Sequence, residues 1–144
     1  MVEIDRRRPG SVNERFDWIC DRCRELIADG TGSVSVAYAD IRRARAERWQ
    51  AMEILLSAGM LRTEDDWADF LVYKPQARWT VRHRACDCRS RPLYWIPVEQ
   101  LRNRRDFISW TSHLVRKPWL METDWLLLMA EMNSQLPGVA ARHG

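Results

Sequence analysis

The sequence predicts a small α+β protein, and three observations support that class. Apolar residues recur at helical spacing in the first and last thirds of the chain, short strand-like runs bounded by turn residues lie between them, and 46% of the residues are hydrophobic. The 144 residues suffice for one domain that buries a core without disulfide bonds. Because no apolar run approaches the ~20 residues of a membrane span and no secretory signal is visible, we expect a cytoplasmic protein with no membrane partner.

A first helix is predicted over residues 13–28, after a flexible lead at residues 1–12. Its apolar residues fall at i, i+3, i+4, i+7, i+10 and i+11, and they are Phe16, Ile19, Cys20, Cys23, Leu26 and Ile27. Asn13 suits the N-cap position, and Gly30 and Gly32 suit the C-terminal end.

Two more helices are predicted at residues 37–43 and 44–58, after a β-prone link at residues 33–36. No glycine separates these helices, so either the shorter one begins near Val36 or the two are nearly continuous. One side of the longer helix gathers Trp49, Met52, Leu55, Leu56 and Gly59.

Strand-like runs follow a turn at residues 63–66, and they cover residues 69–73, 78–82 and 93–98. Residues 74–77 form the turn between the first two runs, and Pro97 indicates that the third is an edge strand or ends there. Helices at about 98–115 and 123–136 complete the prediction.

Three helices followed by a basic strand hairpin describe a winged helix-turn-helix. The stretch GTGSVSV at residues 30–36 resembles the link into the second helix of bacterial and phage winged helix-turn-helix DNA-binding proteins. LLSAGMLRT at residues 55–63 resembles the end of their recognition helix and the entry to their wing. The resemblance covers about residues 14–82 and implies a winged domain at 13–98, with a helical extension at 99–137 and a tail at 138–144.

In that fold, the outward face of the recognition helix reads base edges in the major groove. Here this face carries Arg43, suited to guanine, together with Glu47 and Gln50, the latter suited to adenine. The residues expected to contact the DNA backbone or the minor groove are Arg42, Arg45 and Arg48 on the helix and Lys74, Gln76 and Arg78 on the wing.

Basic residues concentrate in the middle of the chain. Residues 70–117 carry eleven basic residues against three acidic ones, a net charge of +8, whereas the whole chain carries +3. Nearly all of the basic residues are arginine, which suits bidentate contacts to phosphate and guanine and is also enriched by GC-rich genomes. We interpret the protein as a sequence-specific binder of duplex DNA that regulates transcription in a bacterium, phage or mobile element.

The alternative is a non-catalytic interaction protein, such as a phage-type inhibitor, that uses residues 70–117 to bind a host protein or nucleoprotein complex. The apolar face at the C-terminal end either covers the winged domain or forms a homodimer with its copy. That face consists of Trp125, Leu126, Leu128, Met129, Met132 and Leu136.

Four cysteines form two close pairs, Cys20-x-x-Cys23 and Cys86-x-Cys88, and together they could supply the four ligands of a zinc ion. The first pair, however, lies on the apolar stripe of the first predicted helix, where cysteine behaves as a small apolar residue. We therefore predict no bound metal and no cofactor, and zinc at these four cysteines is the alternative.

The sequence does not indicate an enzyme. It contains no HExxH, no GxSxG and no phosphate-cradling glycine loop, and its histidines do not form a recognisable catalytic set. Among its eight tryptophans, Trp79 and Trp95 lie in predicted strands beside arginines. They either stack on the bases of a single-stranded nucleic acid or, as we favour, fill the core.

Overall fold

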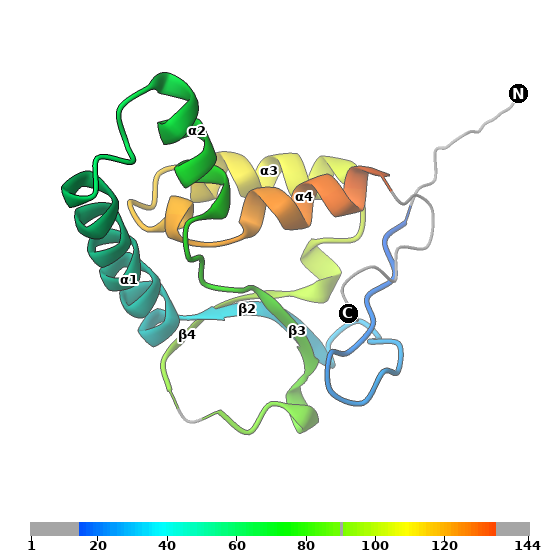
Figure 1. Ribbon diagram of the computed structural model, residues 1–144. Coiled ribbons are helices and arrows are strands. Elements are labelled where there is room, and N and C mark those ends of the chain that lie inside the picture. The colour runs from blue at the N-terminus through cyan, green and yellow to red at the C-terminus, as the bar shows by residue number, and fades with distance from the viewer. Residues whose placement is uncertain (1–14, 90, 135–144) are drawn as a thin grey trace, which may run out of the picture.

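The computed structural model describes residues 15–89 and 91–134, and its elements confirm the α+β class. A three-stranded antiparallel sheet has the order β3-β2-β4, with β2 (Gly32–Ala37) between β3 (Thr80–His83) and β4 (Leu93–Pro97) (Figure 1). The α-helices of the described residues are α1 (Tyr38–Ser57), α2 (Glu64–Tyr73), α3 (Arg104–Leu114) and α4 (Trp125–Ser134). Short 3-10 helices are η1 (Arg84–Cys86), η2 (Val98–Gln100) and η3 (Leu120–Glu122).

The core lies between the sheet and the pair α3 and α4. Val81, Val34 and Ile96 stand side by side across the three strands and are fully buried. Figure 1 shows α3 and α4 on one side of the sheet, whereas the loop that joins β3 to β4 arches away on the other side. The sheet therefore has one face in the core and one face that none of the α-helices in the described part of the chain covers.

Tryptophan rings form the centre of this core. Trp79 and Trp125 are fully buried, and their ring centroids lie 4.9 Å apart. Both indole N–H groups have partners, because Trp79 donates to Thr123 Oγ1 at 3.0 Å and Trp125 donates to Thr111 Oγ1 at 2.9 Å. Because both indole N–H groups are hydrogen-bonded, these large rings can be buried without leaving a polar group unsatisfied.

The helix predicted over residues 13–28 is wrong. The described part of this segment is irregular, with a turn at residues 21–23 and a single β-bridge between Ile19 and Leu26. Fully buried Phe16, Trp18 and Cys20 alternate with more exposed neighbours, which is the period of extended chain rather than of a helix. Leu26, assigned to the predicted stripe, is 63% exposed.

The strand predicted at residues 69–73 is also wrong, because α2 covers these residues. Thr63 is the N-cap: its hydroxyl oxygen accepts from the backbone N–H of Asp66 at 3.1 Å, and the Asp66 carboxylate accepts in return from the backbone N–H of Thr63. This reciprocal capping box starts a helix where the sequence suggested only a turn. The Asp66 carboxylate also accepts from the backbone N–H of Arg62. The hydrogen bonds from Arg62 and Thr63 hold the pKa of Asp66 below its ordinary value.

The two helices predicted at residues 37–43 and 44–58 are one helix, α1, as the absence of a glycine allowed. Trp49, on the apolar side of the predicted longer helix, is 53% exposed. With a strand and two helices between residues 32 and 73, the predicted order of three helices and a hairpin is absent. The structure therefore does not confirm a winged helix.

Later elements match the prediction more closely. Strands β3 and β4 are confirmed, and β4 is an edge strand, as Pro97 indicated. Helix α3 begins at Arg104 and not at residue 98, because the Asn103 side chain accepts from the backbone N–H of Asp106 and caps the helix there. Helix α4 buries its apolar face in the core through Trp125, Leu128 and Met132.

Several expected features lie outside the described residues, namely the lead at 1–12, the Asn13 cap and the tail at 138–144. Buried core residues extend from Phe16 to Met132, so both the segment assigned to 13–98 and the one assigned to 99–137 contribute to a single core. Within the described part of the chain, each helix is too short or too polar to cross a membrane.

Arg102 fixes the irregular segment to the body of the protein. This arginine is 7% exposed, and its guanidinium donates to the carbonyl oxygens of Phe16 at 3.1 Å and Ile27 at 2.9 Å and to the Asp29 carboxylate at 2.9 Å. The hydrogen bonds from Arg102 lower the pKa of Asp29. One side chain thus joins three points of a segment that has almost no regular hydrogen bonding of its own.

We expect Arg102→Ala to lower the free energy of unfolding by about 2–4 kcal/mol, because buried carbonyl groups lose their donors. The exposed Arg104→Ala on α3 serves as the control and should change it by less than about 0.5 kcal/mol. Urea unfolding followed by tryptophan fluorescence measures both values. Equal losses in the two variants would contradict this role of Arg102.

Candidate metal centre and adjoining cleft

Two cysteines lie on a tight turn of the irregular segment. The backbone N–H of Arg24 donates to the Cys20 carbonyl at 3.0 Å, and the backbone N–H of Cys20 donates to the Glu25 carbonyl at 2.9 Å. Arg24 has a φ of 67°, a left-handed conformation that lets the chain reverse within these few residues. The turn therefore brings the thiols of Cys20 and Cys23 together.

Strand β3 and η1 supply two further side chains. His83 is the last residue of β3, and Cys86 lies one 3-10 turn later, where side chains three residues apart point the same way. Asp21 joins the cysteine turn to β3, because its backbone N–H donates to the Val81 carbonyl at 2.7 Å and its carboxylate accepts from the Val81 N–H at 2.8 Å.

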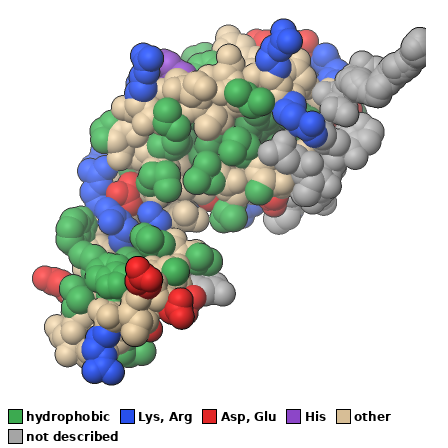
Figure 2. All heavy atoms as spheres, turned by 90° about the horizontal axis from the view of Figure 1, so that it is seen from above, with side chains coloured by type: hydrophobic (Ala, Val, Ile, Leu, Met, Phe, Trp, Pro, Cys, Tyr) green, Lys and Arg blue, Asp and Glu red, His purple; other side chains and the backbone are tan. Residues whose placement is uncertain are grey.

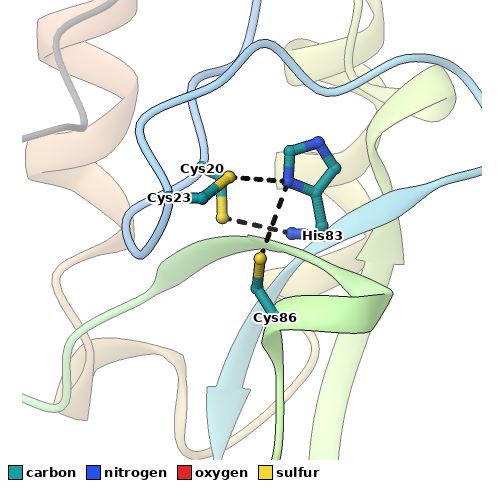
Figure 3. Close-up of side chains that lie close together, drawn as sticks. All are labelled: Cys20, Cys23, His83 and Cys86. Atoms are coloured by element: carbon teal, nitrogen blue, oxygen red, sulfur yellow. Dashed lines mark hydrogen bonds between the residues drawn. The ribbon is translucent and has the colours of Figure 1, made fainter.

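The ligand atoms of Cys20, Cys23, His83 and Cys86 all lie within 4.8 Å of one another (Figure 3). His83 Nδ1 is 3.3 Å from the Cys23 sulfur and 4.0 Å from the Cys86 sulfur. A tetrahedron with Zn–S bonds of about 2.3 Å has edges of roughly 3.8 Å, so these separations match the spacing of zinc ligands.

The second nitrogen of His83 determines which nitrogen faces the thiols. Nε2 lies 3.0 Å from the carbonyl oxygen of Leu26, which can only accept a hydrogen bond. Nε2 therefore carries the proton and donates it, which leaves the Nδ1 lone pair directed at the cysteines. A ligating histidine usually has its other nitrogen fixed in this way.

The thiols differ in their protonation. Burial raises the pKa of Cys20, but the backbone N–H groups of Cys23, His83 and Arg22 and the His83 side chain outweigh burial and lower the pKa to about 6. Burial and the neighbouring Cys23 and Cys20 raise the pKa of Cys86 to about 11. A bound divalent cation would supply the positive charge that lets several thiolates coexist here.

The structure revises the sequence interpretation of the cysteines. It brings together Cys20, Cys23 and Cys86 as the zinc alternative required, but Cys88 is exposed and lies outside the cluster. His83 takes the fourth position, and we had missed it. The argument against a metal relied on a helix at Cys20 and Cys23, and that helix does not exist. The spacing C-x-x-C and H-x-x-C was the available signal.

A cleft of about 380 Å³ lies beside this cluster on the uncovered face of the sheet. Its lining includes Trp95, 58% exposed on β4, and Arg84, which lies between His83 and Cys86 in the sequence. Arg84 also donates to the Gly30 carbonyl at 3.4 Å. The carboxylate of Glu99, also in the lining, accepts from the Gly30 N–H at 2.9 Å.

The arch over this face is fixed by Arg89. Its guanidinium donates to both Asp87 carboxylate oxygens at 2.8 Å and to the Ser35 hydroxyl of β2 at 2.8 Å. Gly32 sits where the segments meet most closely, because a Cβ there would lie 2.6 Å from the Arg82 carbonyl oxygen and 2.6 Å from Ile27 Cγ2. The cleft thus has rigid walls.

The residues predicted to bind DNA are scattered by comparison. Arg48 makes two hydrogen bonds to the buried Glu122 carboxylate, at 3.0 and 2.7 Å, and Arg45 lies 3.5 Å from the same carboxylate. Arg43 pairs with Asp40. Lys74 donates to the Met121 carbonyl. The other residues predicted to bind DNA are exposed, and they are Arg42, Glu47, Gln50, Gln76 and Arg78.

Arg45 and Arg48, which were predicted to contact phosphate, join the first half of α1 to η3 through the Glu122 carboxylate. Of the two strand tryptophans, Trp79 fills the core and Trp95 is available to a ligand. No protein-family model, no curated protein and no solved structure matches the chain.

Proposed function

We propose that this protein is a zinc-containing, non-enzymatic binding protein whose partner is a nucleic acid. The observation that carries the metal assignment is the convergence of three thiols and the Nδ1 atom of His83 within 4.8 Å. Three thiolates and one imidazole are a ligand set typical of structural zinc. Four protein ligands complete the tetrahedron, so no position remains for a reacting water, and the role of the ion is to hold the fold.

Zinc bound here joins parts of the chain that lie about sixty residues apart in sequence. It would tie the turn at Cys20 and Cys23 to the end of β3 and to η1. Because Arg84 lies in η1, the same ion positions a wall of the cleft. Metal binding and the shape of the cleft are therefore coupled.

The nucleic-acid proposal rests on the cleft and on charge. An exposed tryptophan on a strand offers a stacking surface for a base, and a nearby guanidinium offers a contact for phosphate. Trp95 and Arg84 supply this combination, and Arg22 and Arg24 add exposed positive charge on the neighbouring cysteine turn. This arrangement favours an unstacked, single-stranded segment. Duplex DNA read by α1 has weaker support, since Arg45 and Arg48 are bound to Glu122.

We expect the protein to contain one zinc ion per chain and to lose it in Cys23→Ser and Cys86→Ser, because each substitution removes one of four ligands. Cys88→Ser is the matched control, since Cys88 is on the same loop but outside the cluster. Elemental analysis after purification without added metal gives the stoichiometry. Full zinc content in Cys86→Ser, or loss of zinc in Cys88→Ser, would refute the assignment.

We expect Trp95→Ala to weaken binding of single-stranded oligonucleotides by about 5- to 100-fold, the range that stacking of one base supports. Arg84→Ala should weaken binding and reduce the salt slope by about 0.7, as for the loss of one phosphate contact to a single strand. Fluorescence anisotropy with labelled single strands and duplexes at several salt concentrations measures both effects.

Trp95→Phe and Gln50→Ala serve as controls for this experiment. Phenylalanine keeps a stacking ring. Gln50 lies on α1, which contributes no residue to the lining of the cleft. If Gln50→Ala and Arg43→Ala instead abolish preference for one duplex sequence while Trp95→Ala has no effect, α1 is the recognition element and the cleft proposal is wrong.

A further inference from the structure

Exposed apolar side chains are concentrated on one part of the molecule. Seven of the fourteen large hydrophobic residues that are exposed among the described residues lie between positions 49 and 72, on α1, α2 and the link between them. They are Trp49, Ile54, Leu56, Met60, Trp67, Leu71 and Val72. Figure 2 shows apolar side chains covering the smaller lobe of the molecule, with acidic side chains among them. We call α1 from Trp49 onward, the link and α2 the helical lobe.

The helical lobe buries little of its own surface. The buried residues of α1 are Ile41 and Ala44, both near its start, so the second half of this 20-residue helix leaves the body without a buried side chain. Among the side chains of the lobe that the structure describes, Leu61 and Phe70 are the buried ones, at 7% and 8% exposure. Between the helices lies a groove of about 370 Å³ lined by Ala51, Leu55 and Met60, among others.

Such a concentration of exposed apolar side chains on a projecting helix and its neighbour marks a protein interface rather than a solvent-facing surface. A helix of this length without tertiary packing is marginally stable in water, so a partner would also stabilise it. The remaining question is which partner fits.

Charge along α1 indicates a second copy of the same chain. Residues 42–48, near the start of the helix, contain four arginines and one glutamate; Arg43, Arg45 and Arg48 pair within the chain with Asp40 and Glu122, and Arg42 is the exposed arginine left for a partner. Residues 53–72, at its end and on α2, contain five acidic residues and one arginine. A surface that is basic at one end and acidic at the other is complementary to itself when two copies pair antiparallel.

We propose that the protein forms a symmetric homodimer through an antiparallel pair of α1 helices, with α2 flanking the contact. Arg42, Trp49, Glu53 and Leu56 are spaced at i, i+7, i+11 and i+14, which places them on one side of α1. When two such helices cross antiparallel near Trp49, the Arg42 of each copy faces the Glu53 of the other, and the two Trp49 rings pack near the two-fold axis.

This interface replaces the dimer expected through the C-terminal helices. Helix α4 has buried Trp125, Leu128 and Met132 in the core of its own chain, and Leu126 and Leu127 are what it leaves exposed. The proposal is also independent of zinc and of nucleic acid, since none of the four cluster residues and no residue named for the cleft lies on α1 or α2.

Sedimentation equilibrium of the full chain at micromolar concentrations tests the proposal. The unaltered protein should be a dimer, Trp49→Glu should raise the dimer dissociation constant at least tenfold, and Leu127→Glu on α4 should leave it unchanged. Trp49 and Leu127 are 53% and 59% exposed, so neither substitution removes a core side chain. Circular dichroism and zinc content of each variant confirm that it is folded.

Charge reversal tests the antiparallel arrangement itself. Arg42→Glu and Glu53→Arg should each weaken the dimer, and the double variant should restore it at low ionic strength, because the pair is then re-formed with opposite signs. A monomeric unaltered protein would overturn the proposal. So would dissociation by Leu127→Glu but not Trp49→Glu, or a double variant that is no stronger than the single ones.

Discussion

The attachment of residues 15–31, the segment before β2, to strand β3 is the constraint on which the rest of the structure depends. That segment places Phe16, Trp18 and Cys20 in the core, yet the described part has little regular hydrogen bonding of its own. Two hydrogen bonds between Asp21 and Val81 fix the position of this segment along β3. The cysteine–histidine cluster lies beside them, and a metal ion bound there would add stronger bonds between the segment and β3. At the far end, Arg102 binds the segment a second time.

The two faces of the sheet follow from this attachment. With Phe16, Trp18 and the α3–α4 pair packed on one side, Val34 and Val36 of β2 are directed into the core, and Ser33 and Ser35 belong to the opposite face. The polar face is then available to the arch between β3 and β4. The cysteine–histidine cluster, the cleft and the sheet are therefore parts of one arrangement, whereas the helical lobe is attached to it mainly through the first turns of α1.

The sequence predicted those elements whose signals are local. Strands β3 and β4, the edge position signalled by Pro97 and most of α1 came from propensity and turn residues. The prediction of a helix at residues 16–27 was wrong. The apolar positions there fit a helical period, but the side chains that are buried alternate along the chain. The prediction also failed at α2, where the capping pair Thr63 and Asp66 was a helix signal that the β-prone residues after it concealed.

The cysteine–histidine cluster could be predicted from the sequence only in part, for a related reason. The three cysteines could be named, but their approach to His83 depends on the pairing of β2 with β3, a contact between residues about fifty positions apart. Besides the H-x-x-C spacing to Cys86, nothing local to His83 distinguished it from an ordinary loop histidine. The exposure of Trp95 and the burial of Trp79 likewise depend on which face of the sheet the helices cover, and strand propensity carries no such information.

The strand order has a consequence for the way the chain is made. Strand β2 is the central strand, yet both of its partners follow it by more than forty residues, with α1 and α2 between. During synthesis on a ribosome, Cys20 and Cys23 emerge long before His83 and Cys86. The cluster therefore cannot form until synthesis has passed residue 86. The helices between them can form in that interval from local contacts alone. Assembly of the sheet and of the cysteine–histidine cluster can then be completed only late in synthesis, and a chain truncated before β4 would have neither a finished sheet nor the strand that carries Trp95.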